Sequence, residues 1–221
     1  MMKHVMALVL AAVQPTAAGQ IGLDAAAGQT IKGVPATFDL AGFRLGMAEE
    51  EAEQVLKTRG MTVTRRSRTN TFEDRVRKLV NLRGGRLPMK GGSVLESADI
   101  DDGKGGKIMI RMFAWPDGAR IRSVTYLPLG GTDPAVWRTL LVDKYGPPAR
   151  DGDSINADGL HANWCGRLEC IIGGKAFSLS AGVGLRGGSI ALSQPEGTSS
   201  KLTALVEQEA SRHGAQGTPA L

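Results

Sequence analysis

The sequence predicts an α+β domain in which helices cover one side of an antiparallel sheet. Three observations lead to this class. Apolar residues recur at helical spacing in several segments, a period-two alternation starts near Lys107, and Gly-rich turns separate short apolar runs toward the C-terminal end. Strands joined by tight turns are antiparallel neighbours, because parallel neighbours need long crossover connections. We therefore expect an antiparallel sheet with helices on one face, in a single domain spanning residues 38–214.

The individual elements follow from these patterns and from the residues at their ends. Glu49–Glu51 fill a first helical turn, where the helix dipole favours negative charge, and Gly60 ends that helix. Thr71 begins a second helix in a capping-box pattern, and Pro134 suits the first position of a third. In chain order we expect a strand at 38–45 interrupted at Gly42, a helix at 47–59, a strand at 61–65, a helix at 71–82, a hairpin at 107–127, a helix between Asp133 and Gly146, short strands at 161–165, 169–172, 176–181 and 189–193, and a helix at 199–213.

The first residues are typical of an export signal. A basic start at Lys3 precedes the apolar run Val5–Val13, and small residues follow it, so we expect residues 1–18 to be removed as a signal peptide. The run is too short to cross a bilayer, which takes roughly 20 helical residues. A buried N-terminal helix and a retained anchor are the alternatives. The mature protein is expected to be periplasmic or secreted, without a transmembrane segment, with a flexible leader at 19–37 and a frayed tail at 215–221.

The two cysteines, Cys165 and Cys170, are separated by four residues. In an oxidising compartment such a pair predicts a disulfide across a hairpin, which stabilises the fold by about 2 kcal/mol on the chain-entropy estimate. The alternatives are a redox-active pair or half of a metal site. The spacing is not Cys-x-x-Cys, however, and the mature chain offers a metal only His161 and His213. We expect a structural disulfide and no metal or cofactor.

Two short motifs resemble those of known envelope proteins. Phe43-Arg-Leu-Gly-Met47, followed by the helix face Glu51–Leu56 and by Gly60, resembles the opening of the repeat units in SmpA-type outer-membrane assembly lipoproteins and in the β-lactamase-inhibitor-protein-like group. Leu140–Pro148 is similar to a helix exit common in exported proteobacterial proteins. Ala48 departs from the Ser or Thr usual after the Gly-Met, and the lipidation cysteine of the assembly lipoproteins is absent.

The resemblance covers residues 38–66 and 105–150. It implies a binding or scaffolding role at the cell envelope and no catalytic residue. Two tandem repeats, 38–100 and 101–195, followed by the C-terminal helix, are the alternative to a single domain.

A basic segment lies between Arg65 and Lys90. Its nine arginines and lysines, against Glu73 and Asp74, leave a local charge of +7, more than the +5 of the whole chain. Such a patch can hold phospholipid headgroups, lipopolysaccharide phosphates or an acidic protein partner. The candidate binding residues are Arg65, Arg66, Arg68, Arg75, Lys78, Arg83 and Arg86. A solvated helix face is the alternative, and nucleic acid is not expected because the segment lacks interleaved aromatic residues.

One motif suggests a serine hydrolase. Gly152-Asp-Ser154 and Asp158-Gly-Leu-His161 match the nucleophile and partner motifs of GDSL-type hydrolases, with Ser154 as nucleophile, His161 as base and Asp158 as orienting group. In that fold the two motifs lie far apart in sequence, so that separate loops converge. Here all three residues lie within eight positions of one another, which argues against catalysis.

Two acidic loops, 99–103 and 151–156, are candidates for calcium sites. An EF-hand loop needs Asp or Asn at its first, third and fifth positions and Gly at its sixth. The first loop reaches Gly103 one residue early, and the second has Ile155 at its fifth position. Both are therefore expected to be ordinary turns.

No set of residues converges on a catalytic arrangement. The sequence predicts a non-enzymatic envelope protein that binds a protein partner or an anionic envelope surface, using the sheet face, hairpin loops and the basic segment. A purely structural periplasmic module is a further alternative. Trp115, Trp137 and Trp164 are expected to be core or edge anchors rather than ligand platforms.

Overall fold

The computed structural model describes residues 32–149, 154–156, 159–165 and 176–215. The expected signal peptide lies outside these residues, as does most of the expected leader. In chain order the elements are η1 (Pro35–Thr37), β1 (Asp39–Leu40), β2 (Phe43–Arg44), α1 (Glu49–Arg59), β3 (Thr62–Asn70), α2 (Phe72–Leu82), β4 (Ser93–Asp101), β5 (Lys107–Trp115), β6 (Gly118–Leu127), α3 (Pro134–Tyr145), β7 (Ser154–Asn156), β8 (Gly159–Cys165), β9 (Ser178–Gly184), β10 (Gly187–Ser193) and α4 (Gly197–Ala215).

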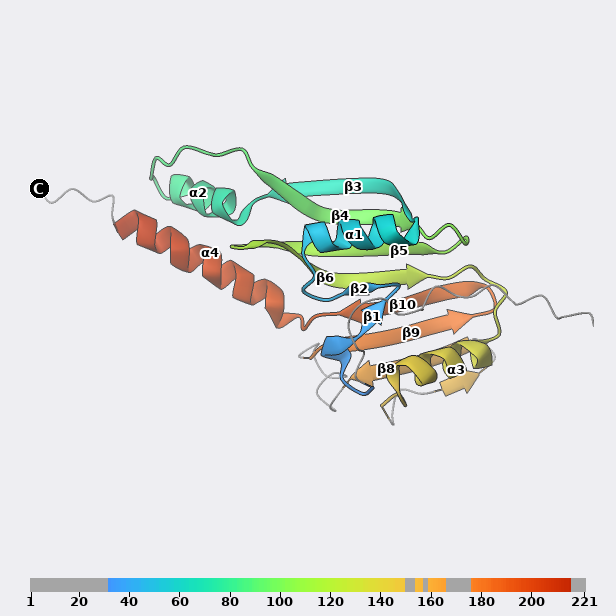
Figure 1. The fold of residues 1–221 in the computed structure, drawn as a ribbon. Helices are drawn as coiled ribbons and strands as arrows, with labels where there is room; N and C mark the ends of the chain where they lie inside the picture. Colours follow the sequence, from blue (N-terminus) through green and yellow to red (C-terminus); the bar gives the residue numbers. More distant parts are fainter. Residues whose placement is uncertain (1–31, 150–153, 157–158, 166–175, 216–221) are drawn as a thin grey trace, which may run out of the picture.

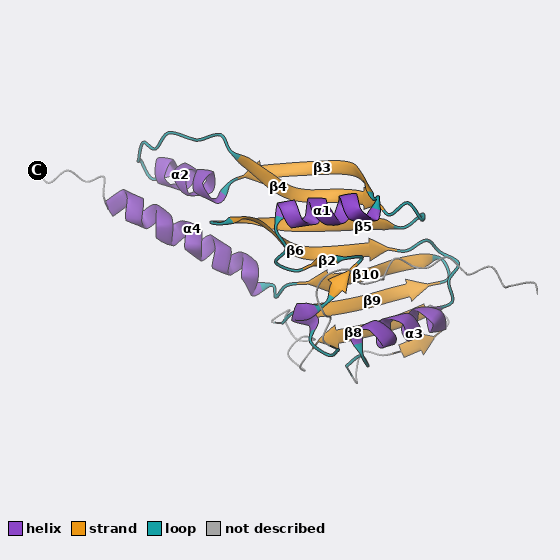
Figure 2. Ribbon diagram, in the orientation of Figure 1, coloured by secondary structure: helices purple, strands orange, loops and turns teal. Residues whose placement is uncertain are grey.

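Eight of the strands form one antiparallel sheet in the order β3-β4-β5-β6-β10-β9-β8-β7. Each half is a meander of four consecutive strands, and the halves meet where β6 pairs with β10. The helix that precedes each meander, α1 or α3, lies over the same face of the sheet (Figures 1 and 2). The predicted α+β class, with antiparallel sheet covered on one side by helices, is confirmed.

The two halves divide between Leu127 and Pro134, at the connection from β6 to α3. The repeat boundary expected between residues 100 and 101 therefore falls inside the first half, at the end of β4. The reason is that β4 and β5 are hydrogen-bonded neighbours, so a cut there would divide one meander.

The main core fills the space between the sheet and helices α1 and α3. Along β5 and β6, residues facing these helices are buried and alternate with residues that are partly or fully exposed. Trp137, Leu141 and Tyr145 of α3 and Ala52 and Leu56 of α1 belong to this cluster. Gly60 adopts a left-handed conformation (φ 64°) where α1 ends, as its position in the sequence predicts.

Ala48 has no side-chain oxygen to cap α1, yet the first turn is satisfied. Glu51 Oε2 accepts the Ala48 N–H at 2.7 Å, which is the reciprocal half of a capping box. With Ala48 in place of the usual Ser or Thr, the start of α1 keeps the bond from the Ala48 N–H to Glu51 and lacks the bond that a side-chain hydroxyl would accept.

A second, smaller cluster joins α2 to α4 at one end of the sheet (Figure 1). Thr71 caps α2 by accepting the Asp74 N–H at 3.1 Å, as the capping-box pattern predicts. The buried Asp74 carboxylate accepts the N–H groups of Lys90 and Gly92, which ties down the connection from α2 to β4. Phe113 and Trp115 of β5 pack against this cluster and link it to the sheet.

Strand β4 was not predicted, and β3 is longer than the expected strand at 61–65. In β4 the buried residues Leu95 and Ala98 are three apart, because Glu96 is an extra residue at an irregularity in the pairing with β3. This breaks the period-two signal. Strand β3 lies at the sheet edge and is mostly charged or hydroxylated, a composition that protects an edge from further pairing but hides the strand from a hydrophobicity pattern.

The expected strand at 38–45 is two short strands, β1 and β2, which pair with each other across Gly42. The described chain starts before them, within the expected leader, where the Gly33 N–H donates to the Tyr145 carbonyl at 2.9 Å. Asp39 and Lys144 form an ion pair at 2.9 Å with both side chains largely buried. These contacts fix the N-terminal segment against the end of α3. The expected strand at 169–172 lies outside the described residues.

None of the helices in the described ranges combines the length and the apolar character needed to cross a lipid bilayer.

Candidate binding site

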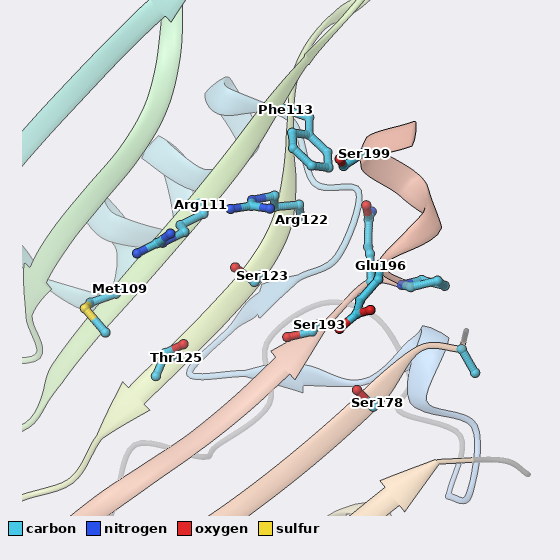
Figure 3. A pocket seen from close by; sticks show the side chains of 13 residues that line it. Met109, Arg111, Phe113, Arg122, Ser123, Thr125, Ser178, Ser193, Glu196 and Ser199 are labelled. Atoms are coloured by element: carbon cyan, nitrogen blue, oxygen red, sulfur yellow. The ribbon is translucent and has the colours of Figure 1, made fainter. Parts of the chain in front are cut away.

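The face of the sheet opposite α1 and α3 is lined mainly by small polar side chains. One row of paired residues crosses seven strands of the sheet. Its members are Ser67, Ser97, Arg111, Ser123, Ser193, Ser178 and Cys165. No helix covers this row in the part of the chain that the structure describes, and α1 lies behind the sheet when the row is viewed from the front (Figure 3). We call this surface the open face.

Two adjoining hollows follow the open face. The first, of about 690 Å³, extends from β5 and β6 across Ser193 and Ser178 to the beginning of α4, where Glu196 and Ser199 form its rim. The second, of about 720 Å³, extends from β5 toward β3 and α2. Both are lined by Met109, Arg111, Phe113 and Arg122. Together they form one groove, with the two arginines at its centre.

Arg122 reaches this position because of a β-bulge. Arg111 pairs with Ser123 and the next residue of β5, Met112, pairs with Ile121, so Arg122 is an extra residue in β6. A bulge redirects a side chain that regular alternation would place elsewhere. Its guanidinium lies over the Phe113 ring, 4.7 Å from the ring centroid, and extends from β6 toward Arg111 on β5 (Figure 3).

The bulge also marks a change of partner along β6. Beyond Ser123, which pairs with β10, the strand bonds to the segment before α1, through Ile121 N–H to Met47 O at 2.9 Å and Gly46 N–H to Ile121 O at 2.8 Å. The backbone partner of β6 therefore changes between Arg122, whose carbonyl accepts the Gln194 N–H at 3.0 Å, and Ile121.

Arg111 and Arg122 form a pair of like charges without a counterion of their own. Neither guanidinium forms an ion pair or a hydrogen bond with any described residue. Burial lowers the pKa of Arg122 below its ordinary value, the Arg111 charge lowers it further, and Glu96 partly opposes both effects. An arginine remains charged under all these influences, so the centre of the groove carries two positive charges that form no ion pair with any described carboxylate.

Carboxylates border the groove on either side of this pair. Glu96 accepts a hydrogen bond from Ser67 at 2.9 Å, and Asp99 lies opposite Arg65 across β3 and β4. On the other side, Glu196 lines the rim near α4. On the β3 side of the groove, side chains of both signs are therefore mixed, because Arg65 and Arg75 line the same hollow as Glu96 and Asp99.

The structure divides the predicted basic segment among separate places. Arg65 and Arg75 line the same hollow as Arg111 and Arg122. Arg66 pairs with Glu53 and Arg68 with Glu49, both on α1. The other predicted residues lie elsewhere: Arg83 forms an ion pair with Glu207 of α4, Lys78 faces α4, and Arg86 is exposed in the connection from α2 to β4. Only two of the seven therefore reach the groove.

Sequence reasoning missed Arg111 and Arg122, although one signal for them was present. In the predicted hairpin, Arg111 alternates with the buried Ile110 and Met112, so it belongs to the face away from the core. A charged residue in the middle of a long central strand, with no opposite charge beside it on the partner strand, is unusual enough to single out. The bulge that brings Arg122 beside it has no clear mark in the sequence.

The first acidic segment, 99–103, comprises the end of β4, through Asp101, and the start of the turn that leads to β5. Asp101 Oδ1 accepts the Gly103 N–H at 2.8 Å, and Asp102 Oδ1 accepts those of Lys104 and Gly106. Asp102 Oδ2 also accepts a bond from the Tyr126 hydroxyl at 3.1 Å. Burial and the Asp102 charge raise the pKa of Tyr126 well above its ordinary value. The two carboxylates therefore accept backbone N–H groups of the turn, as expected for ordinary turn residues.

The residues of the hydrolase motif lie at the other edge of the sheet. Ser154 of β7 and His161 of β8 are direct partners in the antiparallel register. His161 is exposed and lies near Gly182 on the open face. Asp158, like most of the loop at 151–156 considered for calcium, lies outside the described residues.

Cys165 ends β8 in the row of the open face, and Cys170 lies outside the described residues, so the disulfide stays a prediction.

The chain matches no known protein-family model, curated protein or solved structure. The resemblance to the assembly lipoproteins and to the β-lactamase-inhibitor-protein-like group therefore stays a prediction. What the protein binds has to be argued from the groove itself.

Proposed function

We propose that this is a non-enzymatic binding protein of the cell envelope, periplasmic or secreted, whose open face receives an acidic segment of a protein partner. The observation that carries the proposal is the pair Arg111 and Arg122, which lies at the centre of an uncovered groove without a counterion among the described residues. Arginine forms strong, directional hydrogen bonds with carboxylates and is frequent among the residues that dominate protein interfaces. Arg122 is partly buried and Arg111 is exposed.

The form of the site favours a protein partner over a lipid or lipopolysaccharide surface. A membrane surface is broad and binds exposed basic residues that act together. Here three of the seven candidate residues of the basic segment are held in ion pairs with glutamates, Arg66 with Glu53, Arg68 with Glu49 and Arg83 with Glu207. Arg111 and Arg122 lie in a groove with carboxylates on its flanks, and these carboxylates would repel an extended anionic surface. A protruding loop can enter the groove and reach its centre.

Capture from envelope extract tests this proposal. The mature chain is immobilised and incubated with extract at low and at high salt, beside the Arg111→Gln/Arg122→Gln variant. We expect the wild type to retain a defined protein at low salt and to lose it at high salt, because the attraction between charges is screened. The double variant should retain at least tenfold less, since two hydrogen bonds to charged groups are removed.

A matched control separates the groove from overall charge. Arg66→Gln/Arg86→Gln removes the same two charges from positions outside the groove, so we expect capture close to that of the wild type. Equal loss in both double variants would indicate nonspecific attraction and contradict the proposal. If the wild type captures no protein at any salt concentration, the purely structural alternative is favoured. Retention of anionic liposomes by the wild type and the control, but not of protein, would support a lipid surface instead.

A serine hydrolase is a second candidate, supported by the direct pairing of Ser154 with His161 across β7 and β8. Labelling with a fluorophosphonate probe distinguishes it from the binding protein, because the probe reacts only with an activated serine. We expect no labelling of the wild type. Labelling that disappears in Ser154→Ala and in His161→Ala, but persists in Ser180→Ala on the neighbouring open face, would instead establish a hydrolase.

A further inference from the structure

The centre of the groove has a more specific chemistry than general basicity. Arg111 and Arg122 come from adjacent strands, and Ser123, the strand partner of Arg111, follows Arg122 directly in the chain. Neighbouring strands lie about 4.8 Å apart, so the two arginines start from backbone positions within one strand spacing. A ligand that reaches one of them is in the field of both.

The two guanidiniums repel each other, and a single negative charge does not neutralise them. One carboxylate between them leaves a net positive charge beside the partly buried Arg122, whereas two carboxylates bring the pair to neutrality. Glu96 and Glu196 on the flanks limit the size of the negatively charged group, because they repel negative charge that extends beyond the centre. The groove is therefore suited to a compact group with two negative charges.

The orientation of Arg122 agrees with this requirement. Stacking on the Phe113 ring at 4.7 Å covers one face of the guanidinium and leaves the N–H groups at its edge able to donate. Phe113 is itself fixed by the cluster of α2 and α4. Arg122 is thus held in place before a ligand arrives, which reduces the entropy lost on binding.

We infer that Arg111 and Arg122 bind two neighbouring carboxylates on one protruding segment of the partner, and that Arg122 determines the preference for two carboxylates over one. This inference rests on the proposed function and specifies the chemistry of the partner. Phe113, which also lines the groove, is assigned a positioning role because its ring lies under the Arg122 guanidinium.

Short, otherwise uncharged Gly/Ser peptides provide the test. They carry Glu-Glu, Glu-Gln or Gln-Gln at their centre, and their dissociation constants are measured at low salt by NMR titration. For the wild type we expect Glu-Glu to bind about tenfold more tightly than Glu-Gln, as the additional charged hydrogen bonds predict. In Arg122→Gln the ratio should fall to near one, and in Arg86→Gln it should stay at the wild-type value.

Variants of Phe113 examine the positioning role. Phe113→Tyr keeps an aromatic face under the guanidinium and should keep the preference, whereas Phe113→Leu keeps apolar packing but removes the ring and should reduce the ratio. Equal changes in both variants would overturn the role assigned to Phe113.

Three results would overturn the inference as a whole: wild-type protein that binds no peptide, wild-type protein that binds Glu-Glu and Glu-Gln equally, or a preference that persists in Arg122→Gln. A phosphoserine peptide that binds more tightly than Glu-Glu would also overturn it, in favour of a phosphate ligand. If capture from extract depends on Arg111 and Arg122 while the peptides are not discriminated, the proposed function stands and only this inference fails. If capture does not depend on them, the proposed function fails first.

Discussion

Replacing Ser193 by tryptophan is expected to abolish capture of the partner and to leave the fold intact. Ser193 lies in the floor of the groove, between Ser123 on β6 and Ser178 on β9. A large ring at this position fills space that a protruding loop would occupy, without changing any charge. Tryptophan is favoured in strands, and residues of this face are not packed against a helix, so we expect the stability to change by no more than about 0.5 kcal/mol.

The measurement is capture from extract at low salt, which should fall at least tenfold, together with urea denaturation to verify the fold. Ser211→Trp in the exposed part of α4 is the control for an added ring and should capture as the wild type does. Full capture by Ser193→Trp would place the partner outside the groove, even if the arginine variants had lost binding through long-range attraction. Ser193→Trp thus tests whether the partner occupies the groove, whereas the arginine variants test whether the charges of Arg111 and Arg122 are needed for binding.

The helices were predictable because their signals are local. Thr71 and Asp133 cap α2 and α3 with bonds of 3.1 and 2.7 Å, and both bonds connect residues that are close in sequence. Antiparallel pairing was predictable for the same reason, since tight turns leave no other choice. The order of strands in the sheet depends instead on which distant edges meet. Nothing in the residues of β6 and β10 indicates that these two strands, rather than others, join the halves.

The candidate site shows a different limit of sequence reasoning. Counting charges drew attention to residues 65–90, where positive side chains are densest. A count does not reveal pairing, and Arg66 and Arg68 are compensated by glutamates of α1, a helix that precedes them in the chain. Arg111 and Arg122 contribute little to such a count, yet they lack a counterion among the described residues. The proposed function depends on where opposite charges are missing, and only the three-dimensional arrangement reveals those places.

The second large effect concerns the core beneath α3. Trp164→Ala is expected to lower the free energy of unfolding by about 3–5 kcal/mol, the range for removing a large buried aromatic side chain. Trp164 is 2 % exposed, lies edge-on to Tyr145 at 6.2 Å between ring centroids, and donates from Nε1 to the Gly146 carbonyl at 2.7 Å. Since domains of this kind have about 5–15 kcal/mol of total stability, the loss should be evident in urea denaturation.

Trp164→Phe separates the two contributions of this side chain. The phenyl ring keeps most of the packing but cannot donate, so the buried Gly146 carbonyl loses its bond from Nε1, at a cost of about 1–3 kcal/mol. Gly146 follows the last residue of α3, where Gly-Pro-Pro ends the helix, so this bond holds the end of α3 to β8. A loss in Trp164→Phe as large as in Trp164→Ala would mean that the bond, rather than the packing, fixes α3. A loss below about 1 kcal/mol in Trp164→Ala would contradict the burial itself, because a filled core does not tolerate a cavity of that size.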